Sequence, residues 1–185
     1  KGMEAIVNCT VVRPDLEKAF RVNTIGAYNV VKAAVHHNIR RVVHTGPMLM
    51  GMDSESGDRF EYDTPGNVPP RPGRNLYGHT KYLGQEICKT FAYYYGLEIP
   101  ALYYCQFLNA DSDTRNHCFS ITWEDSARAI RRAIEVTSLP SPFESMQILA
   151  DIPQSMFTNT FAKQLLNWAP RDDMERRWQD KAYEG

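Results

Sequence analysis

The sequence lacks the features of a membrane, secreted or nucleic-acid-binding protein. No apolar run approaches the roughly 20 residues needed to cross a bilayer, and the first residues do not have the pattern of a signal peptide. The 21 basic and 22 acidic residues leave a formal net charge of -1, so no basic excess favours nucleic acid or anionic lipid. The 185 residues, 43% of them hydrophobic, can still form a sizeable core. We therefore expect a cytoplasmic globular protein with neither a nucleic-acid nor a membrane partner.

Cysteine is scarce and is not spaced for pairing. The chain has Cys9, Cys88, Cys105 and Cys118, far apart and without a CxxC motif. This pattern predicts reduced, mostly buried thiols rather than a disulfide framework. The adjacent pair His36-His37 lacks the spacing of a zinc-binding pair, so we expect no metal site.

Strand-like and helical patterns alternate through the first 110 residues. Apolar, β-branched runs at 4–12, 39–45 and 99–107 are typical of buried strands. Helical spacing of apolar residues covers 15–37 and 77–95. This order predicts an α/β fold with a Rossmann-like, doubly wound parallel sheet, whose ligands bind at the carboxyl ends of the strands.

The rest of the chain has a looser pattern. Residues 51–76 indicate a long surface loop, and the last third contains a predicted helix at 124–135, a strand at 143–149 and a helix at 159–168. We divide the chain into a partial dinucleotide-binding domain, 1–110, and a small substrate-side region, 111–185. One strand of the second region would return to the main sheet.

One helix start carries a candidate pair for proton transfer. Tyr77-Gly-His-Thr-Lys81 places a phenol and an ammonium on one helical face. An enzyme that oxidises an alcohol needs a group that takes the hydroxyl proton while hydride leaves the carbon. A free tyrosine, with a pKa of about 10, is a poor base near neutral pH, and a nearby lysine cation stabilises the phenolate. The pair is therefore a catalytic candidate, with a purely structural pair as the alternative.

Tyr28 and Lys32 have the same spacing as this pair. They lie in the middle of the helix predicted over 15–37, whereas Tyr77 opens its helix directly after a long loop. We interpret Tyr28 and Lys32 as a surface pair.

Five segments give the Tyr77 motif a family context. They are residues 4–11, 22–34, 40–45, 76–86 and 123–130. In order and spacing they resemble successive signatures of extended short-chain dehydrogenases/reductases, the NAD-dependent epimerase/dehydratase family, over nearly all of residues 4–170. Residues 67–72, followed by Leu76-Tyr77-Gly78, are most similar to uronate dehydrogenase-like members.

The resemblance implies catalytic roles for matching residues. Tyr77 would be the acid/base, and Lys81 its electrostatic partner and a ligand of the cofactor ribose. Asn23, at the start of an Asn-x-x-Gly motif, would organise the proton relay, or alternatively would cap or bend its helix.

The resemblance also implies a cofactor and a partner. Thr10 and Val11 would line the cleft for NAD or NADP, with ordinary packing at a strand end as the alternative. Members of the family pair two helices in a homodimer, here the helices predicted over 15–37 and 77–95.

Two positions depart from the family pattern on the substrate side. The serine or threonine that holds the substrate oxygen in the family falls on Gly46, which leaves the neighbouring Thr45 as the candidate hydroxyl. A shift of one residue in a strand normally turns a side chain to the opposite face. Tyr103 and Tyr104 stand where uronate-like members have a basic residue, which argues against a uronate substrate.

A third departure concerns the cofactor phosphates. None of the eleven glycines forms the Gly-rich turn that brings backbone N–H groups to a pyrophosphate. We expect the first strands of the sheet to be absent, so that the chain is a fragment or its other half is not supplied by this polypeptide. Alone it would bind a dinucleotide poorly.

The sequence thus supports two hypotheses of different classes. The first is an NAD(P)-dependent oxidoreductase or epimerase/dehydratase that acts on a sugar, nucleotide-sugar or similar polyol through a Tyr/Lys proton relay. The second is a non-catalytic dehydrogenase-like protein with a ligand-sensing or assembly role, which Gly46 favours.

Overall fold

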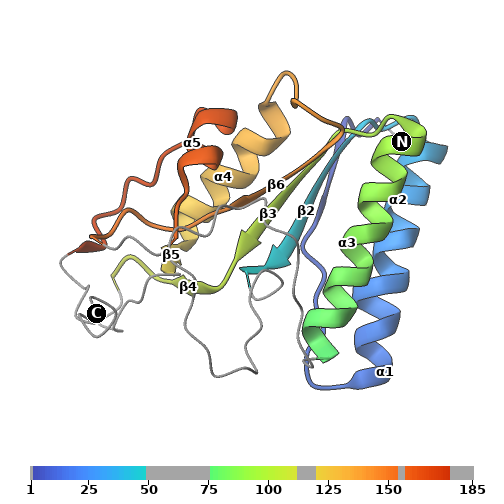
Figure 1. Ribbon diagram of the computed structural model, residues 1–185, viewed down its shortest axis with the longest axis horizontal. Coiled ribbons are helices and arrows are strands. Elements are labelled where there is room, and N and C mark those ends of the chain that lie inside the picture. Colours follow the sequence, from blue (N-terminus) through green and yellow to red (C-terminus); the bar gives the residue numbers. More distant parts are fainter. Residues whose placement is uncertain (1, 49–75, 112–119, 154–156, 176–185) are drawn as a thin grey trace.

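The chain forms a three-layer α/β structure around a parallel sheet (Figure 1). This computed structural model describes residues 2–48, 76–111, 120–153 and 157–175. The sheet has the order β1-β2-β3-β6, formed by Ala5–Asn8, Arg41–Pro47, Ile99–Tyr104 and Phe143–Gln147. All three pairings are parallel, which confirms the expected fold class.

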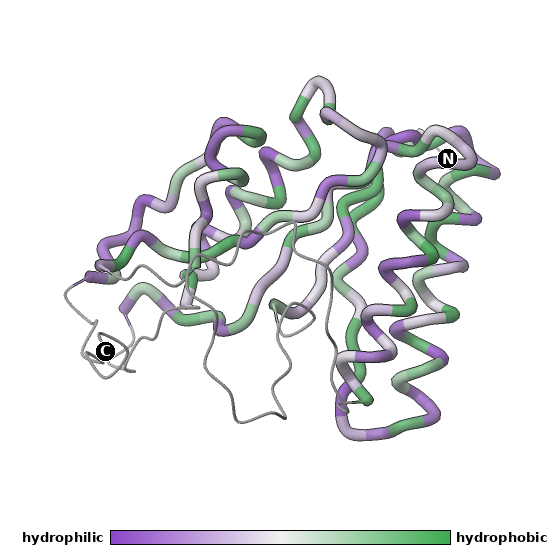
Figure 2. Tube along the Cα trace, in the orientation of Figure 1, coloured by the Kyte–Doolittle hydropathy of each residue, from purple (hydrophilic) through white to green (hydrophobic). Residues whose placement is uncertain are grey.

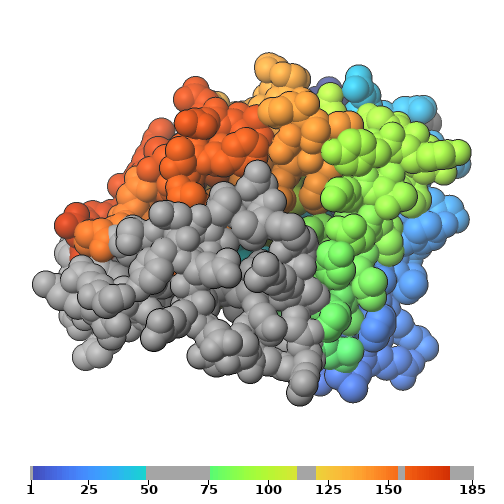
Figure 3. Space-filling view, in the orientation of Figure 1, coloured from blue at the N-terminus to red at the C-terminus, as the bar shows by residue number. Residues whose placement is uncertain are grey.

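Helices cover both faces of this sheet (Figure 1). On one side lie α1 (Leu16–Ala19), η1 (Phe20–Ile25), α2 (Gly26–His36) and α3 (Leu76–Tyr95). On the other lie α4 (Trp123–Glu135) and α5 (Thr160–Leu166). The two groups form opposite flanks of the molecule, with α3 in green and α4–α5 in orange to red (Figure 3).

Each face of the sheet has its own apolar core. Val42 and Ala101 belong to the core beneath α2 and α3, whereas the neighbouring Val43 and Leu102 belong to the core beneath α4 and α5. Successive side chains of a strand point to opposite faces, so a strand buried on both sides needs a continuous apolar run. That requirement explains why these strands were recognisable in the sequence.

The strand ends differ from the sequence prediction. The run over 4–12 is a strand only as far as Asn8, because the Asn8 side chain accepts the Thr10 N–H and forms a local turn that competes with strand pairing. The run over 99–107 is divided into β3 and a short strand, β4 (Gln106–Leu108), which pairs with β5 (Ser120–Thr122). The sequence pattern did not predict β5.

The last third of the chain contributes to the main sheet. Strand β6 pairs with β3 along its length. The division into regions 1–110 and 111–185 stays a prediction. The loop expected over 51–76 lies outside the described residues, apart from Leu76 at the start of α3. Among the described residues, no helix is both long and apolar enough to span a bilayer.

The helix predicted over 15–37 contains a π-helical segment, η1. The whole helical run is capped at its N-terminus, before α1, by Asp15, whose carboxylate accepts the Lys18 N–H. Within the π-helical segment, the Gly26 N–H donates to the carbonyl of Arg21, five residues earlier. Such wide turns recur at functional sites, and this one contains Asn23.

Helix α3 approaches η1 very closely at Gly84. A methyl group at this position would lie 2.2 Å from the Asn23 carbonyl oxygen and 3.2 Å from the Ala27 Cβ. Only glycine therefore allows the two backbones to pack at this distance.

We predict that Gly84→Ala destabilises the protein by about 1–3 kcal/mol or more, because α3 must move away from η1. Gly26→Ala is the matched control, since its methyl group would make only an ordinary 3.5 Å contact with the Arg21 carbonyl and alanine favours a helix. Urea denaturation of both variants measures the difference. Equal stability of the two variants would contradict the close packing.

Candidate functional site

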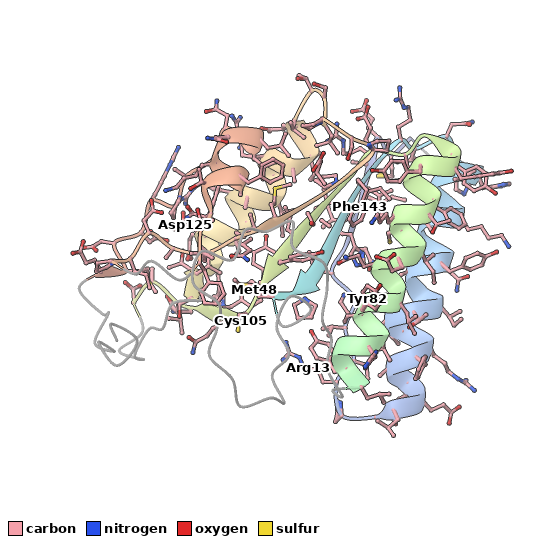
Figure 4. The ribbon with its side chains drawn as sticks, in the orientation of Figure 1. Arg13, Met48, Tyr82, Cys105, Asp125 and Phe143 are labelled. Atoms are coloured by element: carbon pink, nitrogen blue, oxygen red, sulfur yellow. The ribbon has the colours of Figure 1, made fainter. Side chains whose placement is uncertain are left out.

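A cavity of about 300 Å³ lies at the carboxyl ends of the parallel strands, the place where ligands bind in such sheets. The residues that line it come from the segment after β1, from the ends of β2 and β3, from β4, and from α3 and α4. They are Cys9, Val11, Arg13, Thr45, Gly46, Pro47, Tyr77, Lys81, Tyr104, Cys105, Phe107 and Ile130. Figure 4 shows Arg13 and Cys105 at this end of the strands, near the first turn of α3.

Tyr77 and Lys81 both line this cavity. They lie one turn apart at the start of α3, and Tyr77 is half-buried. Within the part of the chain that the structure describes, the Tyr77 hydroxyl has no hydrogen-bond partner. None of these described residues therefore competes with a ligand in the cavity for the Tyr77 hydroxyl.

Lys81 is held deep in the wall of the cavity. Its side chain is only 3% exposed, and its ammonium donates to the Thr10 carbonyl at 3.3 Å. Burial lowers the pKa of Lys81 to about 8, and the nearby thiols of Cys88 and Cys9 offset part of that shift. Near neutral pH the group is still predominantly a cation.

Arg13 is a second cation at the site, and sequence reasoning missed it. Its guanidinium carbon lies 5.2 Å from the centre of the Tyr77 ring, within cation–π distance. In the sequence Arg13 only marked the end of a strand-like run. Its place beside Tyr77 depends on the path of the loop after β1, for which no motif gave a signal.

Asn8 connects the strand ends to Lys81. Its side-chain oxygen accepts the Thr10 N–H at 3.2 Å and the Thr10 hydroxyl at 2.7 Å, and its backbone oxygen accepts the Thr45 hydroxyl at 3.1 Å. The Thr10 carbonyl in turn accepts the Lys81 ammonium. Asn8 is buried and was also missed, because in the sequence it is one polar residue within an apolar run.

The buried imidazole of His44 contacts the Asn8 side chain. The Asn8 amide lies 3.4 Å from Nδ1 of His44, which is also 3.6 Å from the Cys88 sulfur. Burial, with a smaller effect from the Lys81 charge, lowers the pKa of His44 to about 3. Burial likewise raises the pKa of Cys88 to about 12. Both groups are neutral at physiological pH, so Lys81 has no buried countercharge among them.

Asn23 lies in η1 and binds the loop after β1. Its amide accepts the Val12 N–H at 2.9 Å and donates to the Val12 carbonyl at 2.8 Å and to the Thr80 hydroxyl at 2.9 Å. The Thr80 hydroxyl donates to the Tyr77 carbonyl. Asn23 thus reaches Tyr77 through backbone and hydroxyl groups, and its part in a proton relay stays a prediction.

Thr45 and Gly46 both border the cavity, at the end of β2. Thr45 is half-buried, and its hydroxyl donates to the Asn8 carbonyl. Val11 lines the cavity and is 45% exposed, whereas Thr10 contributes its carbonyl to Lys81. The roles expected for Thr45, Val11 and Thr10 in substrate and cofactor binding stay predictions.

The two tyrosines of β3 face different surroundings. Tyr104 lines the cavity, whereas the Tyr103 hydroxyl donates to Gln85 of α3 at 2.6 Å. Burial raises the pKa of both phenols, so they remain protonated. The wall that β3 contributes is therefore uncharged.

Two further sequence interpretations can be compared with the structure. The expectation that the cysteines are mostly buried is wrong for Cys9, which is exposed because β1 ends before it, while Cys105 is partly buried. Cys118 lies outside the described residues. Tyr28 and Lys32 form the expected surface pair, with the Lys32 ammonium 5.6 Å from the centre of the Tyr28 ring.

The fold and motifs identify the family. The model of the NAD dependent epimerase/dehydratase family matches residues 4–136. The chain belongs to this family, as its sequence motifs indicated. The NAD dependence named in the family's description agrees with the cofactor class expected from the sequence.

Solved structures with the same fold include enzymes that act on sugars. A mutated uronate dehydrogenase superimposes with a TM-score of 0.77 and 21% identity over 94% of this chain and 61% of its own. A mutant uronate dehydrogenase from Agrobacterium tumefaciens, complexed with NAD, superimposes with a TM-score of 0.72 and 18% identity, over 94% of this chain and 63% of its own. A UDP-galactose 4-epimerase superimposes with a TM-score of 0.72 and 14% identity, over 98% of this chain and 78% of its own.

The chain spans less than two thirds of the length of both dehydrogenases. No curated protein matches the sequence significantly.

We predict that the buried Lys81 contributes a pH dependence to stability. An unfolded lysine has a pKa of about 10.4, so the unfolded chain binds more protons than the native chain between that value and about 8. The free energy of unfolding should therefore rise with pH across this window, by on the order of 1–3 kcal/mol.

Urea denaturation at pH 7 and pH 10 checks this prediction. The contribution of Lys81 is the rise in the native protein that is absent from Lys81→Met, because other groups also titrate at high pH. Identical pH dependence of the two proteins would mean that Lys81 is not buried as described.

Proposed function

We propose that this chain carries the catalytic side of an NAD(P)-dependent oxidoreductase or epimerase/dehydratase that acts on a sugar, nucleotide-sugar or similar polyol. The observation that carries the proposal is the pairing of Tyr77 and Lys81 at the strand-end cavity. Tyr77, Lys81 and Arg13 line the same cavity, and the Arg13 guanidinium carbon lies 5.2 Å from the centre of the Tyr77 ring. This arrangement suits a phenol that exchanges a proton with an alcohol.

In the proposed reaction Tyr77 takes the proton of the substrate hydroxyl and returns it in the reverse direction. The bound nicotinamide would supply the exchange of hydride. Lys81 and Arg13 stabilise negative charge on the phenol oxygen while the proton is away from it. Tyr104 and Phe107 add apolar groups to the wall of the cavity, and the lower local dielectric beside them strengthens these electrostatic effects.

The residues at the cavity fit one end of a dinucleotide. The Lys81 ammonium uses one of its three protons for the Thr10 carbonyl, so it can also donate to ribose hydroxyl groups. Val11, on the exposed side of the same segment, would face the cofactor. None of the described segments contains a Gly-rich turn for the pyrophosphate, so this chain would hold the nicotinamide and ribose end.

The non-catalytic alternative has one specific observation in its favour. Gly46 has no hydroxyl with which to hold the substrate oxygen, and the Thr45 hydroxyl already donates to Asn8. A protein of this kind would bind the cofactor without turnover. The test below distinguishes it from the enzyme.

In the full-length gene product, we expect Tyr77→Phe to lower kcat by about 10²–10⁴-fold, because it removes the proton-transfer group, while the Kd for NADH changes less than threefold. Turnover with NAD⁺ is measured on a panel that includes uronates and UDP-sugars, and NADH binding by fluorescence. Tyr28→Phe is the matched control, since it alters the surface pair of the same spacing and should leave both values unchanged.

NADH binding without turnover on any member of the panel would support the non-catalytic alternative. Full activity of Tyr77→Phe would exclude Tyr77 as the acid/base.

We also propose that the protein forms a homodimer through the outer surfaces of helices 15–37 and 77–95. Hydrophobic and hydrophilic residues are mixed along α2 and α3 (Figure 2), and several large apolar side chains of α1, η1, α2 and α3 are exposed. They are Leu16, Phe20, Ile25, Tyr28, Leu83, Tyr93, Tyr94 and Tyr95. Exposed aromatic and apolar groups in such number are typical of a protein interface.

The double variant Leu83→Glu/Tyr94→Glu should shift the protein to monomer in analytical ultracentrifugation, because it places charges in the interface. Ile134→Glu is the control, since Ile134 is an exposed apolar residue of α4, on the other flank. A native protein that sediments as a monomer at micromolar concentration would exclude the dimer.

A further inference from the structure

A second hollow, of about 590 Å³, lies on the side of the molecule formed by α4 and the segment after α5. Its lining residues are Arg128, Arg131, Arg132, Glu135, Asn167, Trp168, Ala169 and Arg171. Those of α4 follow the spacing i, i+3, i+4, i+7 and so share one helical face. Ile130, which lines the strand-end cavity, lies on the opposite face of α4. The two hollows are therefore separate.

Hydrogen bonds hold Arg132 against the end of α5. Its guanidinium donates to the Leu166 carbonyl at 3.1 Å and to the Asn167 carbonyl at 3.0 Å. Asn167 adopts a left-handed conformation, with φ 45°, as the C-cap of α5. The Arg132 side chain thus has a fixed position before any ligand binds, which reduces the entropy lost on binding.

Asp125 anchors the other side of this hollow. Asp125 is fully buried, although the helix that carries it is rich in charged residues. Its carboxylate pairs with Arg128 and accepts the backbone N–H of Arg171 at 2.9 Å and of Asp172 at 3.1 Å. One buried carboxylate therefore fixes both an arginine of α4 and the segment that carries Arg171.

The charges around the hollow do not balance. Asp125 neutralises Arg128, and Glu135 pairs with Arg131 at 2.7 Å and lies 3.6 Å from Arg132. Two positive charges remain in excess over these acids. Within the described residues, the Arg171 guanidinium has no partner, whereas the whole chain has a net charge of only -1. The positive excess is thus a local property of these arginines and their acidic partners, and the chain as a whole does not share it.

We propose that this hollow is a binding site for the phosphoryl dianion of a small molecule. Planar guanidinium groups bind phosphate oxygens in a bidentate manner, and an excess of two positive charges matches a dianion. The volume of about 590 Å³ exceeds that of a phosphate group and leaves room for an organic part beside Asn167 and Ala169. The site does not depend on the reaction proposed for the strand-end cavity.

Titration of the chain with inorganic phosphate and with ribose 5-phosphate, at constant ionic strength, tests this site. We expect saturable shifts of the arginine Nε–Hε signals in ¹H–¹⁵N spectra. Arg171→Gln should weaken binding about tenfold, because it removes a charge that has no partner among the described residues. Tighter binding of ribose 5-phosphate would identify a phosphate ester as the ligand, and equal binding would identify free phosphate.

Two further variants separate binding from damage to the fold. Glu135→Gln should strengthen binding about threefold, since it removes a negative charge from the wall, and a misfolded variant cannot produce this gain. Arg21→Gln is the matched control for charge, because Arg21 pairs with Glu17 at 2.7 Å in an i, i+4 arrangement on another helix. Absence of saturation, weaker binding by Glu135→Gln, or an equal loss in Arg21→Gln would overturn the proposal.

Discussion

The candidate active site depends on the side-chain amide of Asn23. This group holds both backbone polar groups of Val12 and the hydroxyl of Thr80, and so joins the loop after β1 to the first turn of α3. Arg13 follows Val12 directly, and Tyr77 and Lys81 flank Thr80. This link therefore helps to hold Arg13 beside the Tyr77 ring. The π-helical turn and Gly84 serve the same purpose, because they let Asn23 come close enough to reach both partners.

The burial of Lys81 is the main electrostatic cost of this arrangement. A buried cation is unfavourable unless polar groups compensate it, and here the compensation is a carbonyl dipole rather than a carboxylate. That carbonyl belongs to Thr10, which Asn8 holds through two hydrogen bonds, and His44 supports Asn8 as a neutral ring. Among the described residues, therefore, no carboxylate would compete with an anionic phenolate or an oxygen-rich ligand in the cavity for the Lys81 ammonium.

Hydrophobic periodicity predicted the sheet because parallel strands are buried on both faces and must read as apolar runs. The Tyr77 motif was likewise visible, since both side chains belong to one helix and four-residue spacing sets their relation.

Arg13 and Asn8 were not visible, because their functions arise from the loop after β1 and from contacts between segments distant in the sequence. The burial of Asp125 was not visible for a related reason: its partners include the backbone N–H groups of Arg171 and Asp172, which a charge pattern does not reveal. The π-helical turn was also missed, because its spacing of apolar residues is close to that of an α-helix.

The hydrogen bond that Thr45 donates bears on whether the protein is an enzyme or a non-catalytic relative. A hydroxyl has one proton to donate and two lone pairs with which to accept. The Thr45 proton is used on the Asn8 carbonyl, so in this arrangement Thr45 can accept from a substrate hydroxyl but cannot donate to a carbonyl product. Tyr77 is then the group that must donate when a carbonyl is reduced, and its hydroxyl has no other partner among the described residues. Because oxidation of an alcohol and reduction of the carbonyl share one transition state, the lack of a hydroxyl at Gly46 would affect both directions of the proposed reaction equally.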